Sequence, residues 1–94
     1  MNKFEIEGKV WRYQGESPWH FVYVSQKISQ QIRDMKRASR NGLVRIKALI
    51  GKTSWTTSLF PTKDGPYLIA VKAEVRRAET IADGDKIKIS CTIL

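Results

Sequence analysis

The sequence lacks several features that identify enzymes and secreted proteins. It contains one cysteine and one histidine in 94 residues, so an intramolecular disulfide is excluded and a reducing, cytoplasmic location is expected. It contains no phosphate-binding glycine loop, no dinucleotide-binding glycine motif and no nucleophile elbow. No apolar run approaches the ~18 residues of a membrane span, and the alternating N-terminus does not resemble a signal peptide. We therefore expect a cytoplasmic protein with no membrane partner.

The few potentially catalytic side chains have structural explanations. Cys91 lies in phase with the apolar residues of an alternating C-terminal run, which predicts a buried thiol without a neighbouring base. His20 stands between two aromatic residues in a β-branched run, a setting typical of a structural histidine. No spacing of His, Cys and carboxylate residues suggests a metal site. We predict no catalytic residue, no metal and no cofactor, and the sequence leaves enzymatic activity open.

Positive charge is what the chain has in excess. Seventeen Lys and Arg residues face nine Asp and Glu residues, which gives a net charge of +8 and favours an anionic partner. Helical spacing predicts one shared face for four of these cations, and alternation in the next strand predicts one face for two more. The candidate basic patch consists of Arg33, Lys36, Arg37, Arg40, Arg45 and Lys47. The alternative is a solvated polar face without a ligand.

The periodicity of apolar residues predicts the element order ββαβββαβ. The first strand begins at Lys3, and its apolar phase blurs past Gly8, which indicates a bulge or a sharp bend. The other expected elements are strands 19–25, 43–50, 53–60, 67–71 and 86–93, helices 26–37 and 72–80, and loops 14–18 and 61–66. Ser25 is a plausible N-cap of the first helix. We therefore expect a mainly β chain that folds as a small six-stranded closed or split β-barrel with two short helices.

A second candidate site surrounds the segment 58–79. Lys72 is expected in the first turn of a helix, where the dipole disfavours a cation, so its presence suggests a phosphate or carboxylate ligand. The candidate pocket residues are Trp55, Phe60, Tyr67, Lys72 and Arg76. The structural alternative is that the segment only reverses the chain direction, with proline ending a strand and Asp64-Gly65 forming a turn.

The aromatic residues offer either stacking platforms or core material. The eight considered are Trp11, Tyr13, Trp19, Phe21, Tyr23, Trp55, Phe60 and Tyr67. Because a 94-residue barrel must fill its interior, we expect most of them in the core. The run 19–25 is aromatic or β-branched on both faces, which predicts a strand covered on both sides. Trp55 and Tyr67, which flank the loop 61–66, are the two expected to be most exposed.

Three stretches carry a family resemblance: WHFVYVSQKIS, ALIGKTSWTTSLFPTKDGPYLIAVKAEVRRAE and ADGDKIKIS. They resemble, in this order, the bacterial family called domain of unknown function 1905, over nearly the whole chain. The resemblance is most specific between Trp55 and Asp85. It implies a small split β-barrel of bacterial origin with no established activity. One departure is Ala70, where the family commonly carries proline.

These observations predict a single β-barrel domain over residues 1–94. The expected function is a non-catalytic binding module for an anionic partner, for which nucleic acid is one candidate. One alternative is a small-molecule pocket around Trp55, Tyr67 and Lys72, with or without catalysis. The other is a protein-interaction domain, and the sequence leaves open whether the chain is a monomer or a homodimer.

Overall fold

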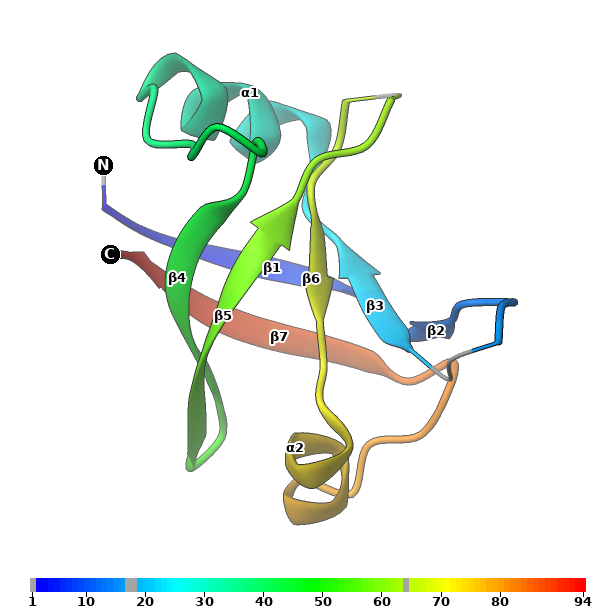
Figure 1. Cartoon of the computed structure of the whole chain (residues 1–94). Helices are drawn as coiled ribbons and strands as arrows, with labels where there is room; N and C mark the ends of the chain where they lie inside the picture. The colour runs from blue at the N-terminus through cyan, green and yellow to red at the C-terminus, as the bar shows by residue number, and fades with distance from the viewer. Residues whose placement is uncertain (1, 17–18, 64) are drawn as a thin grey trace.

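The strands form a nearly closed antiparallel barrel in a computed structural model that describes residues 2–16, 19–63 and 65–94 (Figure 1). Along the chain the elements are β1 (Lys3–Lys9), β2 (Trp11–Arg12), β3 (His20–Tyr23), α1 (Gln26–Asp34), β4 (Val44–Ile50), β5 (Thr53–Phe60), β6 (Leu68–Ala70), α2 (Ala73–Ala78) and β7 (Lys86–Ile93). The strand order is β1-β7-β4-β5-β6-β3-β2. The predicted mainly β barrel with two short helices is confirmed. Ser17 and Pro18 of one expected loop and Asp64 of the expected turn lie outside the described residues.

The barrel closes because the first predicted strand is bent into two strands, which raises the strand number from six to seven. β1 pairs with β7 and β2 pairs with β3, so consecutive strands occupy the two ends of the sheet order. At the bend, the backbone N–H of Val10 donates to the Asp85 carbonyl at 2.9 Å, and the Gly84 N–H donates to the Val10 carbonyl at 2.7 Å. The bend was predicted at Gly8 and lies two residues later, at Val10.

Gly8 permits the close approach of β1 to β3. A Cβ atom at this position would lie 3.1 Å from Cγ1 of Val22, which is fully buried. A side chain at this position would therefore force Val22 or β1 to shift by a few tenths of an ångström, at a contact between strands that are far apart in the sheet order.

The interior contains a row of paired residues that runs across four strands. Phe4 of β1 lies opposite Cys91 of β7, Cys91 lies opposite Ala48 of β4, and Ala48 lies opposite Trp55 of β5. All four are buried, and Cys91 is 2% exposed, as predicted for this thiol. Burial of such rows is the main favourable contribution to folding.

The two helices lie at opposite ends of the barrel (Figure 1). The N-cap of α1 is confirmed, because the Ser25 hydroxyl accepts a hydrogen bond from the Ile28 N–H at 3.2 Å. The predicted C-terminal end was wrong: α1 stops at Asp34, and the chain leaves the helix through Lys36, whose φ is 53°. Within the described part of the chain, neither helix is long and apolar enough to cross a bilayer.

The start of α2 also differs from the prediction. Lys72 is the N-cap residue in an extended conformation and is not in the first helical turn, where Glu74 lies instead. The helix therefore carries an acid where its dipole favours one, and Lys72 does not oppose the dipole from within the helix. The helix dipole therefore gives no reason to expect an anion beside Lys72, and any binding role of this residue depends on where its side chain lies.

Candidate functional site: an aromatic face beside a cationic groove

The outer surface of β2, β3 and the end of β5 carries most of the aromatic side chains of the protein. The chain has three Trp, three Tyr and three Phe residues, and six of these nine lie on this surface. We call them the aromatic face: Trp11, Tyr13, Trp19, Phe21, Tyr23 and Phe60. Tyr13 is 50% exposed, Trp19 is 49% exposed and Tyr23 is 51% exposed. The prediction that most aromatic residues fill the interior was therefore wrong for this group.

Strand alternation explains why these rings face outward. Val22 and Val24 point into the core and are fully buried, so Phe21 and Tyr23 must point to the other side of β3. Trp11 lies opposite Phe21 across the β2–β3 pair and shares its face. The prediction that this strand is covered on both sides was wrong, because Val22 and Val24 fill the inner side and Tyr23 remains in solvent on the outer side.

Phe21 is the centre of the aromatic face. Its ring centroid lies 6.0 Å from that of Trp19, and the two rings are almost parallel, with an interplanar angle of 5°. The Phe60 ring meets Phe21 edge-on at 6.4 Å. Tyr13, Trp19, Phe21 and Phe60 surround a shallow, apolar hollow of about 250 Å³. Such rings are held in place by each other and still present open π surface to a ligand.

A groove of about 570 Å³ adjoins this face, between β3, the end of β6 and α2. Three cations line it, Lys72, Arg76 and Arg77, together with one acid, Glu74. We call it the cationic groove. Arg76 is fixed in position because its Nε–H donates to the Val71 carbonyl at 3.2 Å, which uses one of five guanidinium N–H groups.

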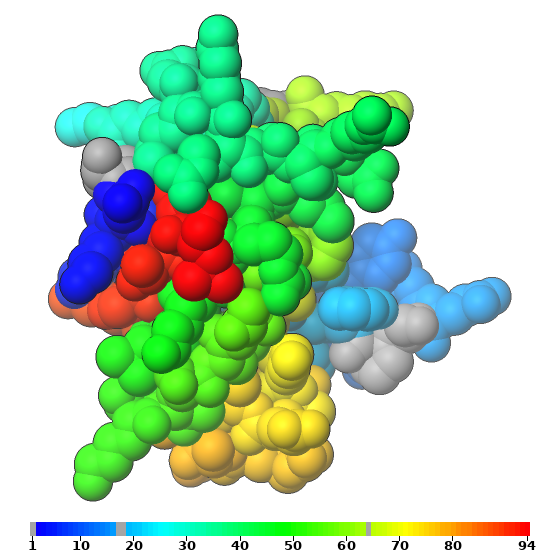
Figure 2. Space-filling model, turned by 60° about the vertical axis from the view of Figure 1, so that its left-hand side comes forward, coloured from blue at the N-terminus to red at the C-terminus, as the bar shows by residue number. Residues whose placement is uncertain are grey.

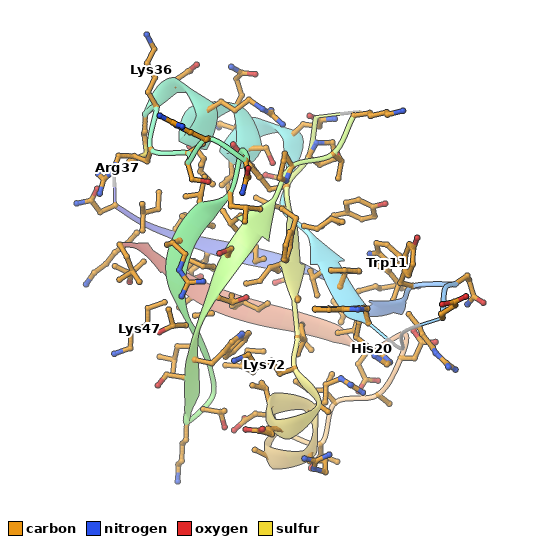
Figure 3. All side chains as sticks on the ribbon, in the orientation of Figure 1. Trp11, His20, Lys36, Arg37, Lys47 and Lys72 are labelled. Atoms are coloured by element: carbon orange, nitrogen blue, oxygen red, sulfur yellow. The ribbon has the colours of Figure 1, made fainter. Side chains whose placement is uncertain are left out.

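Trp19 connects the two features, because it lines both the aromatic hollow and the cationic groove. His20 also lines the groove. Figure 3 shows Trp11 and His20 at the same end of the barrel and Lys72 where β6 leads into α2. Lys72, Arg76 and Arg77 form no ion pair within residues 2–16, 19–63 and 65–94. The ion pair in this part of the chain joins Lys86 to Glu7. The cations of the groove are therefore available to a ligand.

The five candidate pocket residues do not meet in one cavity. Lys72 and Arg76 line the cationic groove, and Phe60 lines the aromatic hollow. Trp55 is 8% exposed and Tyr67 is 3% exposed, so both belong to the core and the expectation that they are the most exposed aromatics was wrong. Tyr67 fills space between β6 and α1, where the Arg33 guanidinium lies 5.0 Å from its ring centroid.

The candidate basic patch is divided between internal contacts and solvent. Of its members from the predicted helix, only Arg33 lies in α1, and it packs on an aromatic ring. Arg37 donates to the Leu94 carbonyl at 3.0 Å, and Arg45 donates to the Ser58 hydroxyl at 2.9 Å. The exposed members without such a contact in the described chain are Lys36, Arg40 and Lys47.

The prediction that Arg33, Lys36, Arg37 and Arg40 share one helical face was wrong, because α1 ends before Lys36. Backbone contacts bring part of the group together: the Leu94 N–H donates to the Arg45 carbonyl at 3.0 Å, next to the Arg37 contact. Figure 3 shows Lys36, Arg37 and Lys47 on the side of the barrel away from Trp11 and His20. In Figure 2, the chain ends lie together on this side, while β2 and the start of β3 project from the opposite side.

The single thiol of the chain and the metal-ligating side chains were considered as possible reactive groups. Burial raises the pKa of Cys91 to about 12, so its thiol is protonated at neutral pH and is a weak nucleophile. In the ranges that the structure describes, no three His, Cys, Asp or Glu side chains form a group that could hold a metal ion. The arrangement is suited to binding a ligand that combines planar groups with negative charge.

Sequence reasoning singled out Lys72 and Arg76 and missed Arg77 and the outward direction of the aromatic face. Part of the signal for that direction is in the sequence: Phe21 and Tyr23 alternate with Val22 and Val24, so the rings and the valines must lie on opposite sides of the strand.

Comparison with known proteins places the chain by family. A comparison with curated proteins gives no match. The model of the family described as "Domain of unknown function (DUF1905)" matches residues 7–91 of the 94, a span that contains both the aromatic face and the cationic groove. The chain therefore belongs to the DUF1905 family.

Proposed function

We propose that this protein is a non-catalytic binding module for an anionic partner. The observation that supports the proposal is the cationic groove, in which Lys72, Arg76 and Arg77 outnumber the single acid, Glu74. The chain as a whole has a net charge of +8, so its long-range field also attracts anions. A proposed cytoplasmic location is consistent with the single, buried cysteine.

The groove is a better candidate than the basic patch for a physical reason. A cation that already contacts the protein must give up that contact, or share it, when a ligand arrives. Arg33, Arg37 and Arg45 are in this position. In the groove, Arg76 is oriented by one backbone contact, while Lys72 and Arg77 are exposed. The groove therefore gathers three cations around one depression, and among the described residues only Arg76 is held by such a contact, compared with three of the six cations of the basic patch.

A salt titration with several anionic probes tests this proposal. Fluorescence anisotropy would follow binding of a labelled single-stranded oligonucleotide, a duplex and inorganic polyphosphate. We expect binding to at least one probe, with an affinity that falls as salt rises, because displaced counterions drive the association. The double variant Lys72→Ala, Arg77→Ala removes two groove cations. We expect its affinity and its salt dependence to decrease together.

The matched control is the double variant Lys36→Ala, Arg40→Ala. It removes the same net charge from exposed positions outside the groove. If the control lowered affinity as much as the groove variant, net charge alone would explain binding and the groove would lose its assignment. Absence of binding to all three probes at low salt would refute the proposed function.

A small anionic molecule is the second candidate ligand. The groove volume of about 570 Å³ lies within the range of about 300–1,000 Å³ typical of small-molecule sites, and His20 on its wall adds a polar group. A mononucleotide that binds as tightly as the oligonucleotide would favour this candidate. A polymer that binds much more tightly than its monomer would favour the extended partner.

A further inference from the structure

We infer that the partner is a single-stranded nucleic acid, whose bases stack on the aromatic face while its phosphates lie in the cationic groove. The inference rests on the proposed anion-binding function and adds the chemical class of the partner. It is carried by a different observation: Trp19 lines both the apolar hollow and the cationic groove.

The two features match the two halves of a nucleotide. A nucleotide carries a planar, aromatic base and a charged phosphate joined by a sugar, so a binding surface needs ring faces and cations side by side. Proteins that bind single strands without sequence preference combine such a basic groove with stacking side chains. Here the hollow around Phe21 supplies the rings, and Lys72 and Arg77 supply the charge.

The rings of the aromatic face are prepared for stacking. Trp19 is half exposed, and its ring is kept nearly parallel to Phe21 at a centroid distance of 6.0 Å. Trp11 and Tyr23 form a second stacked pair, with centroids 5.3 Å apart and planes at 22°. Because their neighbours already restrict these rings, a base that stacks on them pays less side-chain entropy than it would on isolated side chains.

Charge and exposure argue against the other occupants of this face. A second copy of the chain would bring another +8 charge and another cationic groove to the contact, and the two copies would repel. A DNA duplex keeps its base faces stacked inside the helix, so it could use the groove but not the rings. A single strand can occupy both the groove and the aromatic face, because its bases are free to stack on protein side chains.

An abasic oligomer separates stacking from charge. It has the same phosphates as an oligonucleotide of equal length, about 20 units, but no bases, so the difference in affinity between the two chains measures the contribution of stacking. We expect oligo-dT and oligo-U of that length to bind at least about tenfold more tightly than the abasic chain, since each stacked base contributes measurably. We also expect quenching of tryptophan fluorescence with the base-containing chains and little quenching with the abasic chain.

Variants of Trp19 give the matching test on the protein side. Trp19→Ala should weaken oligo-dT binding about tenfold and leave abasic binding unchanged, while Trp19→Phe should retain most of the affinity. Leu49→Ala is the control, because Leu49 is also an exposed apolar side chain, 43% exposed, but lies on β4, outside the face. It should bind oligo-dT like the unmodified protein.

The outcomes distinguish this inference from the proposed function. If oligo-dT and the abasic chain bound equally well and Lys72→Ala, Arg77→Ala weakened both, the partner class would be wrong and the anion-binding function would stand. If no anionic probe bound, both would fail. Tighter binding of an acidic polysaccharide than of oligo-dT would overturn the inference. So would a stable dimer in sedimentation that Trp19→Ala dissociates, since the face would then be a self-association surface.

Discussion

The indole of Trp19 and the ring of Phe21 lie nearly parallel on the outside of the barrel, with centroids 6.0 Å apart. Phe21 lies in β3, and Trp19 directly precedes this strand, so the two side chains point to the same side of it. Val22 points to the opposite side and fills the core. Because large exposed apolar patches often mark interaction sites, the aromatic face is where we expect the proposed partner to bind.

The exposure of Trp19 gives a direct prediction about tryptophan emission. Trp19 is 49% exposed, whereas Trp55 is 8% exposed, so acrylamide should reach the first indole and not the second. We expect Trp19→Phe to lower the slope of the quenching plot and Trp55→Phe to raise it. An unchanged slope for Trp19→Phe would contradict the outward position of this indole.

Ser29 leads to a prediction about stability. It is fully buried, its hydroxyl donates to the Val24 carbonyl at 3.4 Å, and it accepts from the Tyr67 N–H at 3.0 Å. Ser29→Ala would leave the Tyr67 N–H buried without a partner, so we expect a loss of about 1–3 kcal/mol in the free energy of unfolding, measured by urea denaturation.

The matched control for this prediction is Ser25→Ala. Ser25 caps α1 from an exposed position, and loss of such a cap costs about 1 kcal/mol. A Ser29→Ala variant that is no less stable than Ser25→Ala would show that the buried hydroxyl does not hold β6 and α1 together.

Much of the fold could be predicted from the sequence because short-range signals dominate it. The alternation in residues 86–93 predicted the bounds of β7, and the strands predicted at 43–50 and 53–60, separated by two residues, form the β4–β5 hairpin. The helix ends could not be predicted as well. Helical spacing continues through Lys36 and Arg37, but α1 ends at Asp34 and Lys36 adopts a φ of 53°, which no periodicity in this stretch indicates.

The candidate site was harder to predict, because it depends on which side of a strand faces the core. Register determines this side, and a shift of one residue exchanges all inward and outward side chains. Trp55 and Phe60 lie on the same strand, but Trp55 is buried at 8% exposure and Phe60 lies on the outer face. Lys72 and Trp19 are far apart in the sequence, and only the folded barrel places them on one groove.

The buried thiol of Cys91 predicts a stability change at alkaline pH. Burial raises its pKa in the folded protein from 9.0 to about 12. The folded state therefore keeps the proton where the unfolded state loses it. The contribution of this thiol to the free energy of unfolding is fully present below pH 9. It is lost as the pH rises toward about 12, with a slope of up to about 1.4 kcal/mol per pH unit.

The variant Cys91→Ala lacks this titration, so a comparison of the two proteins isolates the thiol from the other ionisable groups. We expect the stability advantage of the unmodified protein over Cys91→Ala to shrink above pH 9, as measured by urea denaturation at several pH values. If the free energies of unfolding of the two proteins changed in parallel across this pH range, the raised pKa of Cys91 would be contradicted.

The approach of β1 to β3 predicts a coupling between Gly8 and Val22. A Cβ at Gly8 would lie 3.1 Å from Cγ1 of Val22, which cannot move freely because it is fully buried. We expect Gly8→Ala to reduce the free energy of unfolding by about 1–3 kcal/mol through overpacking. Val22→Ala removes the methyl group that the new Cβ meets, so in that background Gly8→Ala should cost at least about 0.5 kcal/mol less. Additive costs in the double-mutant cycle would mean that Gly8 and Val22 do not touch, and would contradict the close approach of β1 to β3 at this point.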